Sequence, residues 1–334
     1  MLELEPIRIV SPHLILPDWY NGIYRDSARI SDQFELRSLR MRAARLRARV
    51  GQPTMNDQGH AIAAFLKLHQ SDCFVLPNPW DIGTSRYLEH CGFRALATTS
   101  AGAAFSRGAP DDAWALPRDT MLQHIREIVA ATSLPVNADY QSGYAHEPED
   151  LVTNVTLCVH TGVAGLSIED ATGNTAAPLY ERGLAIERIR AARAAIDATE
   201  HSVVLTARCE AWLVGHAEPR STALDRLVAF AEAGADCLFA PGVRDSETIS
   251  AIVKAVAPKP VNVLMSAPVE GLSVARLADL GVRRISVGSA LARVAWSAFR
   301  QAAKGIAETG SFDALRNAAS FRELNQLFKP NRQS

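Results

Sequence analysis

The chain has 334 residues, and its 35 basic and 36 acidic side chains nearly cancel, so that the formal net charge is −1 at pH 7. This balance excludes the strong surface field by which proteins attract nucleic acid or anionic membranes. The five cysteines form no CxxC pair, no apolar run approaches the roughly 20 residues needed to cross a bilayer, and no signal peptide opens the chain. We therefore predict a cytoplasmic protein with reduced thiols and no nucleic-acid or membrane partner.

Residues 1–54 differ in composition from the rest of the chain and are predicted to form an N-terminal extension. Six arginines crowd a short Leu/Ala/Arg segment at 37–49. A basic helix of this kind can contact phosphate or an acidic partner. We favour a solvated helix packed across one end of the main domain, because acidic residues precede the segment. A native start at Met55 is the other interpretation.

From Met55 onward one pattern repeats: a helical segment, a small residue with a glycine, a short apolar strand and a polar strand end. Gly92, Gly162, Gly234 and Gly281 each separate a helical segment from a strand, where a helix C-terminus favours a left-handed residue. The predicted strands are 74–76, 95–98, a strand at 136, 165–168, 203–205, 237–239, 261–264 and 284–287. The predicted helices include 61–68, 121–131, 151–160, 186–198, 223–233, 291–306 and 312–328.

This order predicts an α/β fold, a (β/α)8 barrel over residues 55–305. Strands that are apolar on both faces belong in a parallel sheet covered by helices, and single barrels with eight βα units reach this length. No GxGxxG follows the first strand, which removes the main dinucleotide-binding alternative. Residues 306–334 form a helical segment with more apolar surface than a free tail, so we expect it to pack on a partner subunit.

Polar side chains stand at the C-terminal ends of the predicted strands, where such barrels carry their catalytic groups. In chain order these ends hold Asp81, Thr99-Ser100-Ala101-Gly102, Asn137 with Asp139, Glu169-Asp170, Arg208 with Glu210, Pro241, Asn262 and Ser289. Asn137 and Asp139 are two residues apart and so point to the same side of their strand. Carboxylates and an amide beside an arginine predict a divalent-cation site next to an anion-binding corner.

Each of these residues also has a structural interpretation. Asp139 could cap a loop, since Asp and Asn are common turn residues, and Arg208 could serve only as an ion-pair partner of Glu210. Cys209 could be a nucleophile, because a neighbouring guanidinium lowers a thiol pKa. We disfavour that role for Cys209 because its strand parity directs it away from Arg208.

Five motifs resemble the isocitrate lyase/phosphoenolpyruvate mutase superfamily: NPWD at 78–81, TTSAG at 98–102, VNAD at 136–139, LSIED at 166–170 and TAR at 206–208. They occur in the expected order and spacing between about residues 55 and 328. The resemblance implies a Mg²⁺-dependent barrel enzyme, with Mn²⁺ as an alternative ion. Its small 2-oxo or 2-hydroxy carboxylate substrate would gain or lose a C–C or P–C bond through an enolate-like species. It also implies a homodimer or homotetramer whose subunits exchange the eighth helix.

The resemblance, with the strand-end pattern, assigns roles to individual residues. Metal binding is predicted for Asp139, Glu169 and Asn137. Substrate binding is predicted for Thr99, Ser100, Ala101, Asn137, Arg208 and Asn262. Catalysis is predicted for Arg208 and for Asp111, which matches an acid that lines the active site and reaches the metal through water.

Three departures from the family pattern bear on the reaction. Asn137 replaces an aspartate that binds the metal directly, so metal affinity should fall or the substrate must supply more. The lid segment 171–180 lacks the lysines, cysteine and histidine of the lyase branch, so isocitrate lyase activity itself is not expected. Pro241 stands where the mutase branch has a histidine. Proton transfer must then come from Asp111, Tyr140, Tyr180 or metal-bound water.

Three functions fit this pattern. The first is a Mg²⁺-dependent lyase that cleaves a C–C bond in a small 2-hydroxy or 2-oxo dicarboxylate by retro-aldol chemistry. The second is phosphonopyruvate chemistry at a P–C bond, as a mutase or a hydrolase. The third is a non-catalytic barrel that binds an oxo acid, an interpretation favoured by the missing lid cysteine.

Overall fold

The computed structural model describes residues 55–329 of the chain. The extension at 1–54, with its predicted arginine-rich helix, lies outside the described residues, as do residues 330–334. No helix in the described range is long and apolar enough to cross a membrane.

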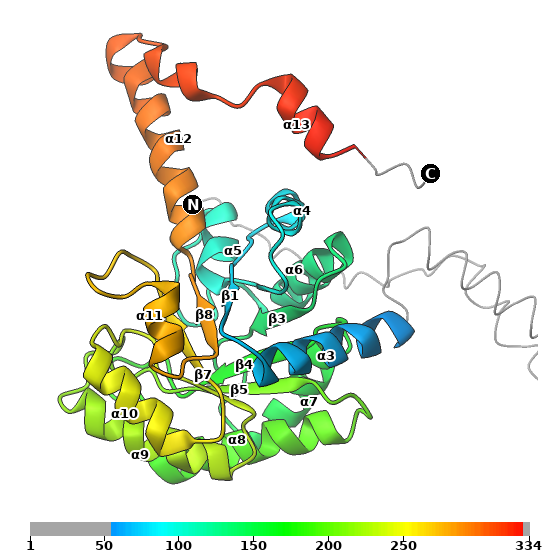
Figure 1. The fold of residues 1–334 in the computed structure, drawn as a ribbon, viewed down its shortest axis with the longest axis vertical. Coiled ribbons are helices and arrows are strands. Elements are labelled where there is room, and N and C mark those ends of the chain that lie inside the picture. The colour runs from blue at the N-terminus through cyan, green and yellow to red at the C-terminus, as the bar shows by residue number, and fades with distance from the viewer. Residues whose placement is uncertain (1–54, 330–334) are drawn as a thin grey trace, which may run out of the picture. The chain divides into compact units, whose positions relative to one another are not determined.

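Eight parallel strands form one sheet in the order β1-β8-β7-β6-β5-β4-β3-β2 (Figure 1). The strands are β1 (Phe74–Leu76), β2 (Leu96–Ala97), β3 (Val136–Asp139), β4 (Gly165–Glu169), β5 (Val204–Arg208), β6 (Cys237–Phe239), β7 (Val261–Leu264) and β8 (Arg284–Ser286). The first strand pairs with the last, and the N–H of Ala97 in β2 donates to the carbonyl of Pro77, just after β1, at 3.0 Å. The sheet is therefore a nearly closed barrel, and the predicted (β/α)8 fold is confirmed.

Helices alternate with the strands and surround the barrel. They are α3 (Met55–Gln70), α4 (Ile82–His90), α5 (Ser100–Ser106), α6 (Arg118–Ala131), α7 (Pro148–Val159), α8 (Arg182–Asp197), α9 (Pro219–Glu232), α10 (Ser246–Val256), α11 (Val274–Asp279), α12 (Ala290–Thr309) and α13 (Phe321–Leu327). Gly92, Gly162, Gly234 and Gly281 have φ angles of +83°, +96°, +105° and +89°. The predicted left-handed helix ends are therefore confirmed, because each glycine turns the chain from a helix back toward the sheet.

The N-terminal end of the barrel is closed by α3. Phe65 of this helix is fully buried. Its ring packs so closely on Gly165 of β4 that a Cβ atom at this position would lie only 2.6 Å from the nearest ring carbon. The rings of Phe65, His69 and Phe74 contact one another edge to face at centroid distances of 4.6, 6.2 and 5.2 Å. These three rings fill the N-terminal end of the barrel, so the C-terminal ends of the strands form its open end.

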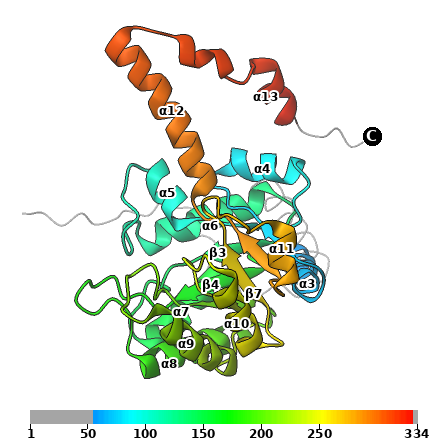
Figure 2. The ribbon, with the colours of Figure 1, turned by 60° about the vertical axis from the view of Figure 1, so that its left-hand side comes forward.

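The C-terminal segment differs from its prediction. A single helix over 312–328 is wrong, because a short 3₁₀ turn at Asp313–Asn317 and α13 are separate elements. Ser320 and Glu323 form a capping box that starts α13 anew. Figure 2 shows α12 extending away from the barrel before the chain turns back. Gly310, with a left-handed φ of +68°, caps the C-terminal end of this helix.

Candidate active site

Two adjoining cavities of about 370 and 380 Å³ open at the C-terminal ends of the strands. Ser100, Asp111, Arg208 and Leu213 line both of them. The first cavity extends over β7 and β8, and the second lies under the lid segment. The predicted site residues Thr99, Ser100, Ala101, Asp111, Asp139, Glu169, Arg208 and Asn262 all line at least one cavity.

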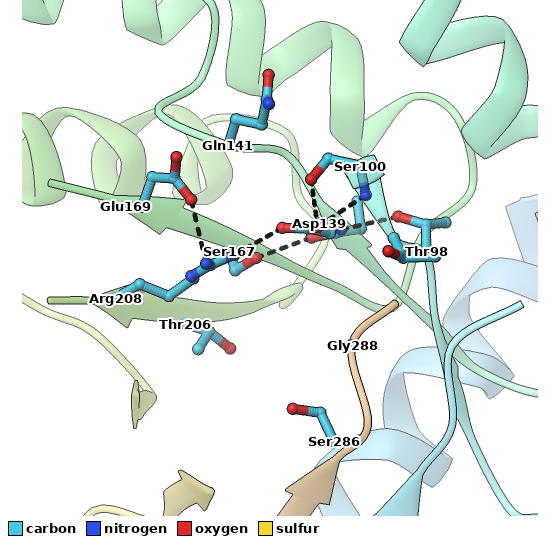
Figure 3. Close-up of polar contacts among 12 residues, drawn as sticks. Thr98, Ser100, Asp139, Gln141, Ser167, Glu169, Thr206, Arg208, Ser286 and Gly288 are labelled. Carbon is cyan, nitrogen blue, oxygen red and sulfur yellow. Dashed lines mark hydrogen bonds and ion pairs between the residues drawn. The ribbon is translucent and has the colours of Figure 1, made fainter. Parts of the chain in front are cut away.

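Arg208 at the end of β5 is held by three carboxylates, and Figure 3 shows two of them, Asp139 and Glu169. Its Nη1 lies 2.7 Å from Asp139 Oδ1, its Nη2 lies 3.3 Å from Glu169 Oε2, and its Nε lies 2.9 Å from Glu210 Oε1. The four side chains are between 6 % and 17 % exposed. The sequence left open whether Arg208 pairs with Glu210 or faces the substrate site. In the structure it pairs with Glu210 and also lies between the two carboxylates expected to bind the metal.

The second oxygen of Asp139 is fixed by the start of α5. Ser100 donates to Asp139 Oδ2 through both its backbone N–H and its hydroxyl, each at 2.9 Å. The Asp139 N–H in turn donates to Thr98 Oγ1 at 2.9 Å. Thr99 is the N-cap of α5, and its hydroxyl accepts from the Gly102 N–H at 3.2 Å. The TTSAG motif thus orients Asp139 and lines the adjacent cavity wall.

The acids outnumber the cations in this cluster. Burial raises the pKa of Glu169 well above its usual value; Arg208 opposes this, and Glu210 and Asp139 raise it further. Burial likewise raises the pKa of Glu210. Asp111 lines both cavities, yet the surrounding protein partly desolvates it. This desolvation, together with repulsion from Asp139, raises the pKa of its carboxyl group. Four carboxylates thus lie around Arg208, and three of them form ion pairs with it.

Asn137 lies deeper in the barrel than the other predicted ligands. Its side chain is buried, its Nδ2 donates to the Ala138 carbonyl at 3.1 Å, and its Oδ1 accepts no hydrogen bond from the described residues. Asn137 lines neither cavity. A direct bond from this amide to a cation in the cavities would require the side chain to turn toward the pocket.

The lid segment closes the second cavity from one side. An isolated bridge joins Ala171 to Leu179, and the Thr172 N–H donates to the Pro178 carbonyl at 3.0 Å. The candidate proton donors near the lid differ in access. Tyr140 is fully buried, and its hydroxyl has no hydrogen-bond partner among the described residues. Tyr180 Oη lies 2.7 Å from His146 Nδ1. Asp111 is therefore the candidate that faces both cavities.

Two buried arginines that the sequence analysis did not single out support the site. Arg226 of α9 lies 3.0 Å from Asp170 Oδ2, and Asp170 Oδ1 accepts from the Glu210 N–H at 2.8 Å. Arg188 of α8 donates to the carbonyls of Ser142, Ala145 and His146 in the loop after β3. In the sequence, both arginines stand among apolar helix residues. This position could have identified them, because an arginine that is buried with such neighbours needs specific partners.

The chain is similar to known proteins over most of the barrel. The family model described as phosphoenolpyruvate phosphomutase matches residues 65–307. A crystal structure from Burkholderia cenocepacia J2315, of a candidate lyase/mutase, is 44 % identical, with 83 % of this chain and 98 % of that chain covered and a TM-score of 0.79. An uncharacterized protein of Mycobacterium tuberculosis is 35 % identical over 224 residues, which are 66 % of this chain and 80 % of that protein. The 2-methylisocitrate lyase of Escherichia coli is 32 % identical over 167 residues, which are 47 % of this chain and 53 % of the enzyme.

The chain therefore belongs to the phosphoenolpyruvate phosphomutase family, within the isocitrate lyase/phosphoenolpyruvate mutase superfamily. The predicted superfamily is confirmed, and the relatives include carbon–carbon lyases.

Proposed function

We propose that the chain is a Mg²⁺-dependent lyase that cleaves a C–C bond in a small 2-hydroxy or 2-oxo dicarboxylate. The observation that carries this proposal is the cluster of Asp139, Glu169 and Glu210 around Arg208, between two cavities at the open end of the barrel. The similarity to 2-methylisocitrate lyase supports the reaction class.

The charges and donor atoms of the cluster fit a divalent cation. Asp111, Asp139, Glu169 and Glu210 stand against one guanidinium, and the raised pKa values of three of them reflect burial and mutual repulsion. In the described range no three acidic, His or Cys side chains converge to hold an ion alone, but Mg²⁺ needs few carboxylates because it keeps several waters. Asp139 and Glu169 would hold the ion, with Asp111 reaching it through water. The predicted ligand Asn137 lines neither cavity and would join them only after its side chain turned toward the pocket. The bound ion would supply positive charge for an enolate-like transition state.

The protein's own groups bind and orient the substrate. Arg208 donates two of its five N–H groups to Glu210 and Asp139 and forms an ion pair with Glu169 through Nη2. N–H groups on Nη1 and Nη2 therefore remain for substrate oxygens. The Ser100 hydroxyl and the adjoining backbone of Thr99 and Ala101 form the cavity wall against which a substrate carboxylate would lie. Asp111 would hold or release the transferred proton on its carboxyl group, because a raised pKa brings a carboxylic acid nearer to neutral pH.

A panel of 2-oxo and 2-hydroxy acids, assayed with Mg²⁺ and with EDTA, tests the proposed function. We expect Mg²⁺-dependent release of a 2-oxo acid from at least one dicarboxylate. Binding without turnover across the panel would favour the non-catalytic barrel.

The second candidate is P–C bond chemistry, favoured by the description of the family model. A changed phosphorus NMR signal from phosphonopyruvate would identify it.

Turnover should survive alkylation of the accessible thiols. Cys209 is fully buried, and burial raises the pKa of its thiol. None of the five cysteines, all within the described range, lines either cavity. We expect iodoacetamide treatment and Cys209→Ser each to change turnover by less than about twofold, since an inert thiol is a packing group. Complete loss in both, with substrate binding retained, would make Cys209 the acid–base group.

We propose that the exposed apolar side chains of α12 and the segment after it pair with a second copy of the chain. Val294, Phe299 and Phe312 are 67 %, 61 % and 66 % exposed, and exposed large apolar side chains that gather on one segment are typical of interaction surfaces. The double variant Val294→Asp/Phe299→Asp should sediment as a monomer, whereas the wild type and the control Gln301→Asp should sediment as a dimer or tetramer. A monomeric wild type at micromolar concentration would contradict the proposal.

A further inference from the structure

The position of Asp111 depends on the backbone of a short connecting segment. Residues 107–117 lie between α5 and α6 and form neither helix nor strand. Asp111 lines both cavities, but with the described residues its carboxylate forms no ion pair and no hydrogen bond. The contacts of residues 111–114, which we call the Asp111 segment, therefore decide where this carboxylate lies.

The side chain of Gln141 joins the Asp111 segment to the loop after β3. Its Oε1 accepts from the Trp114 N–H at 3.2 Å, and its Nε2 donates to the Asp112 carbonyl at 3.4 Å. Within the described range, the segment's backbone forms one other hydrogen bond, in which the Asp112 carbonyl accepts from the neighbouring Ala115 N–H at 3.2 Å. Gln141 thus holds the segment at two points.

The indole ring of Trp114 anchors the same segment. Its Nε1 donates to Ser142 Oγ at 3.0 Å. The ring stacks on Tyr144 with a centroid distance of 6.2 Å, and its centroid lies 4.7 Å from that of the His146 ring. All three partners belong to the loop after β3, so the Asp111 segment is attached to the strand that carries Asp139.

The backbone at this junction has an uncommon conformation. Trp114, Gln141 and Tyr144 have left-handed φ angles of +56°, +48° and +56°. Residues with a side chain rarely adopt this region, because the Cβ atom approaches the following carbonyl oxygen. Glu200 is the one other non-glycine residue of the described range with such an angle. Strained residues persist where surrounding contacts determine them, which indicates that the junction is held tightly.

Gln141 borders the carboxylate cluster without taking part in it. Its backbone carbonyl accepts from the Glu169 N–H at 3.0 Å, and its side chain lines the second cavity. Figure 3 shows its amide pointing away from Asp139 and Arg208. Gln141 therefore connects the backbone of one site carboxylate to the segment that carries another.

We propose that Gln141 and Trp114 are positioning residues, which clamp the Asp111 segment to the end of β3 and so hold the Asp111 carboxylate at the two cavities. The proposal rests on the proton-transfer role proposed above for Asp111. Gln141 and Trp114 act on the reaction through Asp111 and not by contact with the reacting atoms. A fixed carboxylate favours proton transfer because the step depends steeply on the distance between the reacting groups.

Hydrogen exchange at the Trp114 amide of the full chain tests the clamp. Gln141→Met keeps the length of the side chain and removes both hydrogen bonds, so exchange at this amide should become at least about tenfold faster. Gln123→Met is the matched control, because the Gln123 amide bonds to Glu127 and Arg126 of its own helix. It should leave the exchange rate unchanged. Unchanged exchange in Gln141→Met would overturn the clamp.

The kinetics of the dicarboxylate found in the panel test the effect on Asp111. Gln141→Met should lower kcat at least about tenfold and leave KM within about threefold, because a displaced proton donor slows the chemical step while Arg208 still binds the substrate. Wild-type exchange in α8 would show that the variant keeps its fold. Faster exchange at Trp114 with an unchanged kcat would overturn the positioning role.

A double variant shows whether Gln141 acts through Asp111. In an Asp111→Asn background, Gln141→Met should lower kcat by less than about twofold, because the group through which it acts is already lost. A further tenfold loss would overturn the proposal.

Trp114→Phe keeps an aromatic ring against Tyr144 and removes the N–H that Ser142 accepts. It should raise the exchange rate at residue 114 and lower kcat by about threefold each. No change in either measurement would overturn the role of Trp114. The exchange measurements need no turnover, so an inactive wild type would refute the proposed reaction, and exchange would still decide whether the clamp exists.

Discussion

Asp139→Asn should lower turnover by at least about 10²-fold and abolish the response of the protein to Mg²⁺, while the fold is retained. The asparagine keeps the shape of Asp139 and can still accept from Ser100. It removes the negative charge that faces Arg208 at 2.7 Å and that we expect to anchor the cation. The measurements are Mg²⁺ titration calorimetry and initial rates on the dicarboxylate found in the panel.

Asp112→Asn is the matched control, because Asp112 also lines a cavity but forms no ion pair with the described residues. It should change the rate less than about threefold, as expected for an exposed carboxylate. Wild-type rates and Mg²⁺ affinity in Asp139→Asn would contradict the assignment of Asp139 to the site.

Arg208→Met should lower the free energy of unfolding by about 3–5 kcal/mol at pH 8, because it leaves three carboxylates without the cation they share. The exposed pair of Arg220 and Glu247 provides the control. Arg220→Met should cost less than about 1 kcal/mol. Urea unfolding of both variants and the wild type measures the difference. A loss of the same size in both variants would contradict a special role for the buried cluster.

The Arg208→Met variant should also become more stable as the pH falls from 8 toward 5. The pKa values of Glu169 and Glu210 are already raised above 4.5 in the folded protein, and Arg208 opposes that rise. A carboxyl group with a raised folded-state pKa contributes stability below its unfolded pKa and loses it as the pH rises through the folded value. The recovery therefore begins where these groups take up protons, and it should exceed the change in the wild type. An equal pH dependence in both proteins would contradict the coupling.

Much of the fold and part of the site could be predicted from local sequence signals. A left-handed glycine after a helix and a short apolar strand are determined by neighbouring residues, so Gly92, Gly162, Gly234 and Gly281 marked real boundaries. The same holds for the strand ends, because parity and βα order place Asp139, Glu169 and Arg208 at one end of the barrel.

The tertiary structure alone decided how the charges are shared. That Arg208 binds three carboxylates depends on distances between β3, β4 and β5, which no local pattern encodes. How deep Asn137 lies also depends on the barrel as a whole. The alternation of side chains along a strand predicts the side to which Asn137 points, but not its distance from the open end. The break before α13 arises from the capping box at Ser320, which outweighed the apolar pattern across it.

Arg284 of β8, which is 2 % exposed and forms no ion pair with the described residues, differs from Arg208 for the same physical reason. In the sequence both are arginines on apolar strands, and only their burial and partners distinguish a charge shared among acids from one left uncompensated. The identities of the residues determined which charges enter the barrel, and the closed sheet determined which of them meet.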